Sequence, residues 1–492
     1  MDTTLILICL AGYFGLLFII SQLTSRQANN AAYFTANRSS SWRLVAFGMI
    51  GASLSGVTFI SVPGMVATDQ FSYMQMVLGY IPGYVLIAFV LMPLYYRLNL
   101  TTIYTYLAQR FGPVSHKTGS SFFLLSRLMG SALRMYLVVN VLQLILFDSL
   151  GVPFWLTVIL SILLVWLYTF RAGMKTIVWT DTLQTAFMLL ALGSTIYLIG
   201  QEMGWGFGEM MRYVSESDYS RTFFMDDAGN AKFFYKQFLS GALIALVMTG
   251  LDQDMMQKNL TCKNVGEAQK NMVSFTVVLM FVNLLFLSLG VLLYAYAHKM
   301  GLAIPVKGDD LYGFIATGDT LPAIVGVFFV LGLVAAAYSS ADSALTALTT
   351  SFCIDILGIE KKELNKQESI RKQVHVGFSV LTMVVMIVAR EFHDESLIKT
   401  IFKVASYTYG PLLGLFAFGM FSKRQVNDLL TPFICIAAPL ISFWIAFNSP
   451  EWFGYTFSYE ILLVNGLITC LGLWVSGIGR QSKDLSATTV NT

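Results

Sequence analysis

The sequence predicts an all-α polytopic membrane protein, and three observations support this prediction. Of the 492 residues, 56% are hydrophobic and only 12% are charged, whereas soluble domains carry roughly a quarter of charged residues. Apolar runs long enough to cross a bilayer recur along the whole chain. Basic residues gather in alternate connections between these runs, which is typical of proteins that cross a membrane repeatedly.

Hydropathy over windows of about 20 residues predicts roughly thirteen transmembrane helices. In chain order they are expected at residues 4–24, 45–66, 72–96, 120–148, 153–170, 176–200, 235–257, 272–297, 321–353, 372–390, 397–421, 427–447 and 458–478. The first run has no basic n-region and no cleavage site, so we expect a retained span rather than a signal peptide. The five cysteines form no CxxC or Cys/His cluster, so neither disulfides nor a zinc site is expected.

The basic residues predict the orientation of the chain in a cell (inner) membrane. One set of connections holds Arg26, Arg38, Arg43, Arg97, Arg110, Lys117, Arg171, Lys175, Lys258, Lys263, Lys270, Lys361, Lys362, Lys366, Arg371, Lys372, Lys423, Arg424, Arg480 and Lys483. The positive-inside rule therefore places the N-terminus outside and the C-terminus in the cytoplasm. The longest opposite loop, residues 201–234, is too short for a soluble domain, and we expect a brief surface helix in it.

Two predicted spans are interrupted by residues that weaken a helix. The seventh carries Gly250 to Gln253 well before its basic end. The centre of the second holds Gly48, Gly51, Ser53, Ser55 and Gly56. Gly-kinked helices without a site are common, but unwound backbone at mid-membrane also lines cavities and offers carbonyls to ions. We favour a broken-helix site because the interruptions lie five spans apart, as two inverted five-helix halves would place them.

The segment 331–354 is apolar enough to cross a bilayer, yet its middle is rich in hydroxyls. Ser339 and Ser343 lie on one helical stripe, and Ser340 and Asp342 flank it. Oxygen ligands on a face of small residues suit a hard, weakly held cation such as sodium. The alternative is a helix-packing face with a structural aspartate.

Charged residues in two further spans are costly in a bilayer. Arg134 lies near the middle of the fourth span, and Asp181 lies in the sixth. Arg127 is closer to a helix end, where its side chain is expected to snorkel to the surface. A structural Arg–Asp pair could explain any one of these residues. Together with Asp342, however, two acids and a base in three spans indicate an ion or substrate path.

Four segments carry a resemblance to the sodium:solute symporter family, whose members transport sugars, sialic acid, proline or iodide with sodium. They are GASLSGVTFISVPG (51–64), VWTDTLQ (178–184), GLDQDMMQKN (250–259) and AAAYSSADSALTALTTSFCIDI (335–356). The resemblance implies a LeuT-like core of two inverted five-helix repeats at residues 45–421. One helix and a cytoplasmic loop (1–44) precede this core, and two helices and a cytoplasmic tail (422–492) follow it.

The resemblance also implies two cation sites. The common sodium site would use the carbonyls of Gly51, Leu54 and Ala336 and the hydroxyls of Ser339 and Ser340. A second sodium site, found in the family's sialic acid transporters, would use Asp181, Ser339, Asp342 and Ser343. The chain departs from those transporters at Asp342, where they carry a serine. The extra carboxylate could strengthen the site, bind a proton or change the stoichiometry.

The solute would bind beside the two interrupted helices. The candidate residues are Ser55, Thr58, Tyr73, Asp252 and Gln253. Arg134 matches the arginine that holds the carboxylate in the sialic acid transporters, and a guanidinium fork suits a carboxylate bidentately. Val77 stands where those transporters have a glutamine, so the chain departs from their pattern at this position.

The function expected from these observations is a sodium-coupled symporter that imports a small polar solute by alternating access. The solute favoured is an anionic sugar acid such as sialic acid; the alternatives are a neutral sugar, a polyol or an amino acid. A proton-coupled carrier of the same fold is a rival, and a channel or membrane sensor is another.

The chain has no GxxxxGK[ST] loop and no visible nucleophile–His–acid set, so neither an ATP-driven pump nor an enzyme is expected. The expected partners are the solute, sodium and the lipid bilayer, with no nucleic acid and no obligate protein partner.

Overall fold

The structure is a computed structural model that describes residues 3–25, 30–169, 173–318, 320–391 and 397–478. Within these ranges every regular element is helical, and the only extended pairing is an isolated bridge between Ser40 and Cys262. The prediction of an all-α protein is confirmed for this part of the chain. Residues 479–492 of the expected cytoplasmic tail lie outside the described residues, as do four basic residues of the topology prediction, namely Arg26, Arg171, Arg480 and Lys483.

The α-helices follow one another through mostly short connections. Their bounds are α1 (Thr3–Ser25), α2 (Asn30–Thr35), α3 (Trp42–Ser53), α4 (Gly56–Gly64), α5 (Val66–Asp69), α6 (Ser72–Leu86), α7 (Met92–Arg97), α8 (Thr105–Arg110), α9 (Pro113–Leu142), α10 (Phe154–Thr169), α11 (Met174–Met203), α12 (Phe207–Glu216), α13 (Phe234–Ala245), α14 (Gln253–Asn259), α15 (Val265–Lys299), α16 (Leu311–Thr317), α17 (Ala323–Ser351), α18 (Leu364–Ala389), α19 (Leu397–Thr408), α20 (Gly410–Phe421), α21 (Thr431–Phe453) and α22 (Ile461–Ser476).

The candidate membrane spans agree only in part with the sequence prediction. Among the described residues, eight helices are long and apolar enough to cross a bilayer, and three bent pairs raise the number to 11. Helices α10 and α22 are apolar but shorter. The structure therefore supports 8 to 11 spans and does not confirm thirteen, although every expected range overlaps one of these helices. The short helix expected in residues 201–234 is present as α12.

Three spans are bent at short breaks between consecutive helices. Helices α3 and α4 meet at 54° next to Ser55, and α13 and α14 meet at 69° across Asp252, whose backbone is extended. These are the two interruptions that the sequence predicts. A third bend of 45°, between α19 and α20, lies at Tyr409. The sequence predicts one continuous helix at residues 397–421, and the bend at Tyr409 corrects that prediction.

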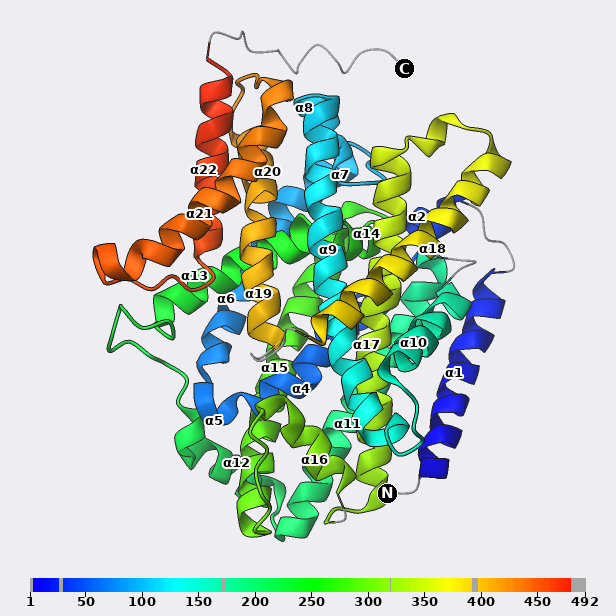
Figure 1. Ribbon diagram of the computed structural model, residues 1–492, viewed down its shortest axis with the longest axis vertical. Coiled ribbons are helices and arrows are strands. Elements are labelled where there is room, and N and C mark those ends of the chain that lie inside the picture. The colour runs from blue at the N-terminus through cyan, green and yellow to red at the C-terminus, as the bar shows by residue number, and fades with distance from the viewer. Residues whose placement is uncertain (1–2, 26–29, 170–172, 319, 392–396, 479–492) are drawn as a thin grey trace.

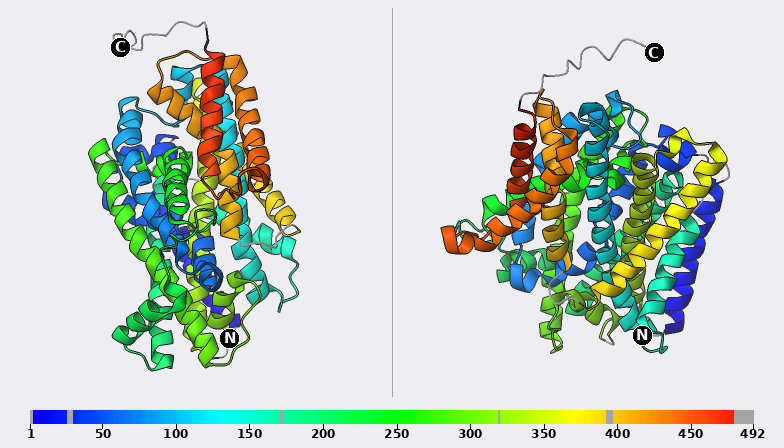
Figure 2. Two further views of the ribbon diagram at one scale, coloured as in Figure 1. Left: turned by 90° about the vertical axis from the view of Figure 1, so that its left-hand side faces the viewer. Right: turned by 45° about the horizontal axis from the view of Figure 1, so that its top comes forward.

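Helix α17 lies in the interior, and most of its side chains are buried. It packs against α11, α9 and the bent pair α3–α4. Helix α1 lies at one edge of the molecule and α21 and α22 lie at the opposite edge, as two views agree (Figures 1 and 2). The polar stripe of residues 331–354 is therefore enclosed by protein rather than exposed to lipid.

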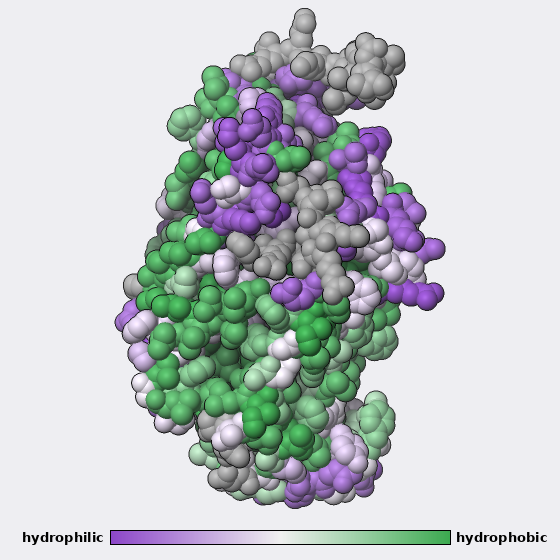
Figure 3. Space-filling model, turned by 90° about the vertical axis from the view of Figure 1, so that its right-hand side faces the viewer, coloured by the Kyte–Doolittle hydropathy of each residue, from purple (hydrophilic) through white to green (hydrophobic). Residues whose placement is uncertain are grey.

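The outer surface has the distribution of side chains that a bilayer requires. One face is hydrophobic across its middle, with hydrophilic residues gathered toward both ends of the long axis (Figure 3). Many large apolar side chains of the outer helices are exposed, among them Phe89, Trp155, Leu190 and Phe281. Such a broad apolar surface is unusual for a soluble monomer and suits contact with lipid tails.

Candidate functional site

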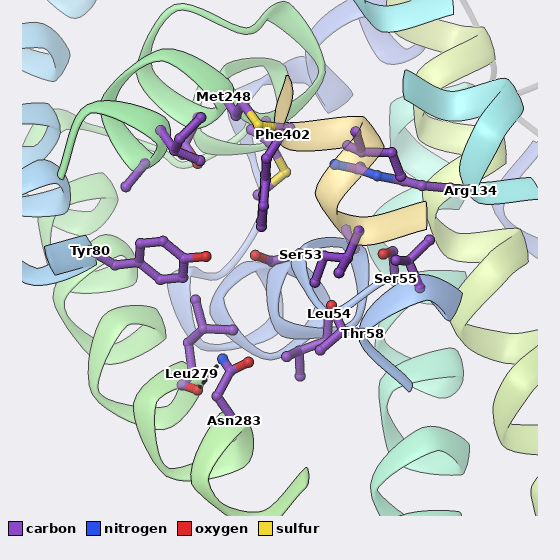
Figure 4. Close-up of a pocket in the computed structure, with 18 of the residues that line it drawn as sticks. Ser53, Leu54, Ser55, Thr58, Tyr80, Arg134, Met248, Leu279, Asn283 and Phe402 are labelled. Carbon is purple, nitrogen blue, oxygen red and sulfur yellow. Dashed lines mark hydrogen bonds between the residues drawn. The ribbon is translucent and has the colours of Figure 1, made fainter. Parts of the chain in front are cut away.

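A cavity of about 70 Å³ borders the bent pair α3–α4, and this volume is large enough for several water molecules. Helices α6, α9, α13, α14, α15 and α19 also contribute to its wall (Figure 4). Because α3 and α4 meet here, irregular backbone faces the cavity. The polar residues of its lining are Ser53, Ser55, Thr58, Tyr73, Tyr80, Tyr84, Arg127, Arg134, Thr249 and Asn283.

The structure brings four of the six expected solute-binding residues to this cavity, namely Ser55, Thr58, Tyr73 and Arg134. Asp252 and Gln253 are fully buried and do not line it. The Gln253 amide donates to the carbonyl oxygen of Thr101 at 3.0 Å and accepts from the backbone N–H of Ile103 at 2.9 Å. These two residues hold α14 against its neighbours instead.

Several polar residues of the cavity were not selected from the sequence. The hydroxyls of Tyr73 and Tyr80 are 3.1 Å apart, and Tyr80 points across the cavity toward Ser53 (Figure 4). The amide of Asn283 donates to the carbonyl of Leu279 at 2.8 Å, and its Oδ1 has no hydrogen-bond partner among the described residues. The sequence contains features that could identify both residues. Tyr80 follows Tyr73 by seven residues and so lies on the same helical face, and Asn283 is an amide in an apolar span.

Arg127 does not snorkel, and the expectation that it does is wrong. Its side chain is only 4% exposed and forms an ion pair with Asp254, while its Nη1 lies 3.6 Å from Oδ2 of Asp252. The hydroxyl of Tyr409 donates to the same Asp252 carboxylate. The physical reason is the 69° bend, which directs the start of α14 toward α9 and brings both carboxylates to the arginine.

Arg134 lies on the same face of α9 and lines the cavity. No carboxylate of the described residues lies within 4.0 Å of its guanidinium. The acids considered as its partners contact other groups: Asp252 contacts Arg127, Asp181 contacts Lys258 and Asp342 contacts Tyr168. An arginine in a membrane protein is costly without an anion. The cavity is therefore suited to an anionic ligand.

The expected common cation site lies where α17 meets the break of α3. The hydroxyl of Ser340 donates to the carbonyl oxygen of Ala52 at 3.3 Å. One residue earlier in α3, the N–H of Gly51 donates to Oγ1 of Thr185 at 3.0 Å. Leu54 ends the hydrogen bonding of α3 by donating to Ile50. Hydroxyl and carbonyl oxygens thus converge at an irregular helix end, which is the type of ligand that sodium prefers.

The two intramembrane acids lie beside this point, on α11 and α17. Oδ1 of Asp181 accepts from the hydroxyl of Ser339 at 2.6 Å. Asp342 accepts from the hydroxyl of Tyr168 at 3.0 Å and from that of Ser343 at 3.3 Å. The four residues expected at a second cation site, Asp181, Ser339, Asp342 and Ser343, are therefore neighbours in the structure.

Lys258 is also part of this cluster, which the sequence did not indicate. Its Nζ lies 2.7 Å from Oδ2 of Asp181, and its side chain is 2% exposed. Its assignment to a cytoplasmic basic connection is wrong. The last turn of α14 carries Lys258 back into the protein, because the bent helix crosses the interior instead of continuing outward.

Comparison with known proteins identifies the family. Residues 33–428 match the sodium:solute symporter family. The chain belongs to the sodium:solute symporter family. It is a sodium-coupled transporter, and this membership confirms the prediction of a carrier rather than an enzyme.

Relatives of this symporter include sialic acid transporters. Over 474 residues the chain is 25% identical to the sodium/sialic acid symporter NanT of Aliivibrio fischeri. The aligned region covers 90% of this chain and 88% of NanT. It is 24% identical over 447 residues to the sodium/sialic acid symporter SiaT of Proteus mirabilis, covering 84% of each. A solved substrate-bound, outward-open Na+-coupled sialic acid symporter has a TM-score of 0.81 at 18% identity, covering 98% and 99% of the two chains. That likeness shows the fold.

The ligand types in this symporter agree with sodium as the co-transported ion. Among the described residues, no group of three or more His, Cys, Asp or Glu side chains could hold a metal ion. The oxygens near the break of α3 come instead from hydroxyls and carbonyls, with Asp181 and Asp342 close by. Weakly charged oxygen sets suit a cation that must bind and leave in every cycle.

Proposed function

We propose that this symporter imports an anionic sugar acid, such as sialic acid, together with sodium by alternating access. The observation that carries this proposal is Arg134, a cavity-lining guanidinium without a carboxylate within 4.0 Å among the described residues. The similarity to NanT and SiaT supports the same class of solute. Hydroxyls of Ser55, Thr58 and Tyr73 line the same cavity and suit the hydroxyl groups of a sugar acid.

The geometry of Arg134 favours a carboxylate over a neutral solute. A guanidinium offers a planar fork of donors that matches the two oxygens of a carboxylate. Because Asp252 and Asp254 lie against the guanidinium of Arg127, the guanidinium of Arg134 is available to bind the ligand. The charge-assisted hydrogen bonds of such a pair contribute roughly 1.5–3 kcal/mol, which is about ten- to a hundredfold in affinity.

Sodium binding is proposed at the break of α3, with ligands from Gly51, Leu54, Ala336, Ser339 and Ser340. A cation there would connect α3 to α17 and fix the bend that borders the cavity. Binding of sodium would then raise the affinity for the solute, and linkage makes the effect reciprocal. The contact of Ser340 with Ala52 supports this placement.

The proposed topology has thirteen spans in a cell membrane, counting α10 and α22 with the 11 candidates. The bends of α3–α4 and α13–α14 support a core of two inverted repeats at residues 45–421, with residues 1–44 before it and 422–492 after it. The start of α1 and the end of α22 lie at opposite ends of the molecule (Figure 1). The positive-inside rule then puts the N-terminus outside and the C-terminus in the cytoplasm.

A binding experiment on purified protein tests the proposed solute. Titration calorimetry in sodium buffer compares sialic acid with its methyl ester, which lacks the negative charge. We expect wild type to bind the acid at least tenfold more tightly than the ester. Arg134→Lys should bind the acid about ten- to a hundredfold more weakly, because a point charge cannot reproduce the fork.

Arg43→Lys is the matched control, since Arg43 is exposed and outside the cavity, and it should bind as wild type does. Equal binding of the acid and the ester by wild type would contradict an anionic solute. In that case a neutral sugar, polyol or amino acid becomes the better proposal, and Arg134 becomes a structural residue.

A further inference from the structure

Three charged side chains from three helices meet in the interior of this symporter. They are Asp181 of α11, Lys258 of α14 and Asp342 of α17, and their exposed fractions are 1%, 2% and 0%. Because all three side chains are almost completely buried, any charge that they carry is balanced inside the protein.

Asp181 has both carboxylate oxygens engaged. Oδ1 accepts from Ser339 at 2.6 Å, and Oδ2 pairs with Nζ of Lys258 at 2.7 Å. A second sodium ion on this carboxylate would therefore have to displace the lysine or share its oxygen. The ammonium of Lys258 is a cation of the same charge, and it is attached to the protein.

Asp342 differs from Asp181 because it has only neutral hydrogen-bond donors. Tyr168 and Ser343 donate to its two oxygens, and no basic side chain of the described residues lies within 4.0 Å. With both carboxylates ionised, the two acids and the ammonium give the cluster a net charge of −1. One monovalent cation is needed to balance it, and Ser340 of the proposed sodium site lies between Ser339 and Asp342 on α17.

We propose that Lys258 serves as a tethered cation that fills the second cation site at Asp181, so that this symporter binds one exchangeable sodium ion. This proposal rests on the sodium coupling described above and adds its stoichiometry. The single sodium ion balances the remaining charge, and its ligands lie at the break of α3. The charge on Lys258 stays with the protein throughout the cycle and is not transported.

Counting bound sodium on the purified full chain tests this proposal. Equilibrium binding of radioactive sodium is measured to saturation for wild type and variants, without any solute. We expect one ion per chain in wild type and in Lys258→Arg, which keeps the positive charge. Lys258→Met leaves a net charge of −2 and should bind two. Lys258→Met combined with Asp181→Asn restores −1 and should bind one.

The control is Lys270→Met, the same change at an exposed lysine, which should bind one ion. Two ions bound to wild type, or one bound to Lys258→Met, would overturn the tethered-cation proposal. If Lys258→Met does not fold, the double variant decides, because any count other than one contradicts the charge balance. A wild type that binds no sodium at all would contradict the proposed coupling instead, so the two failures are distinguishable.

Discussion

Ser340 is the side chain that most directly connects the polar helix α17 to the break of α3. Its hydroxyl reaches the carbonyl oxygen of Ala52 at 3.3 Å. If the same hydroxyl is a sodium ligand, Ser340→Ala removes one of about five oxygens. We expect the sodium concentration for half-maximal solute uptake to rise roughly two- to tenfold, since one hydrogen-bond-like contact contributes about 0.5–1.5 kcal/mol.

The measurement is solute uptake into proteoliposomes at a series of sodium concentrations. Ser379→Ala is the matched control, because Ser379 is also a buried serine, and its hydroxyl bonds to the backbone of His375 within α18, away from the break of α3. It should leave the sodium dependence unchanged. An unchanged dependence in Ser340→Ala would remove Ser340 from the sodium site.

Arg127 provides a second test at the scale of single residues. Asp254→Asn removes its closest carboxylate and leaves only Asp252, whose Oδ2 is 3.6 Å away. An incompletely paired buried guanidinium should lower the free energy of unfolding by about 1–3 kcal/mol. The melting temperature of the protein in detergent measures this change.

Glu368→Gln breaks the exposed pair with Lys372, in which both side chains are more than 40% exposed, and serves as the control. An exposed pair contributes roughly 0–1 kcal/mol, so the melting temperature should hardly change. Equal effects of the two substitutions would show that the Arg127–Asp254 pair does not stabilise the folded protein.

At the scale of single residues, the sequence predicted only some of the side chains that meet in the site. The types of chemistry were readable, because charged side chains in apolar spans are costly without a partner or a function. The partners were not, since the sequence gives the position of Lys258 along the chain but not the direction of α14 after its bend. The same bend turns Asp252 and Gln253 away from the cavity, although both adjoin the break.

At the scale of elements, the two predicted breaks were found because glycine and serine weaken a helix locally. The third break, at Tyr409, was missed although Gly410 and Pro411 follow it. Residues 397–421 were assigned by hydropathy, and hydropathy does not respond to a bend in an apolar helix. The contact of Tyr409 with Asp252 joins this bend to that of α13–α14.

Close packing between α6 and α13 offers a test of the element arrangement. A Cβ on Gly241 would lie 2.0 Å from the carbonyl oxygen of Met76, and one on Gly79 would lie 2.0 Å from that of Phe238. Gly241→Ala must therefore separate the helices, and we expect a loss of about 1–3 kcal/mol of stability. Melting in detergent measures the effect.

Gly193→Ala in α11 is the matched control, because a Cβ there meets nothing within 4 Å. Alanine favours a helix over glycine by about 1 kcal/mol, so this variant should be as stable as wild type or slightly more stable. A Gly241→Ala variant with wild-type stability would contradict the contact between α6 and α13.

At the scale of the whole molecule, the hydropathy pattern predicted an all-helical membrane protein and the positions of its helices, but the structure supports 8 to 11 spans rather than thirteen. Every expected span overlaps a helix, because the bilayer imposes both the length and the apolar character of each span. The solute was not predictable to the same degree. The side chains of the proposed solute site, such as Tyr80 and Asn283, meet in one cavity only through the packing of helices that lie far apart in the sequence.

The coupling of solute import to sodium is tested most directly by uptake into proteoliposomes. Radiolabelled sialic acid is offered outside at fixed pH, with either an inward sodium gradient or choline in its place. We predict accumulation above the outside concentration with the sodium gradient and only equilibration with choline, and Ser340→Ala should accumulate less at low sodium. Equal accumulation in choline, or accumulation driven by a proton gradient alone, would contradict sodium coupling in this chain.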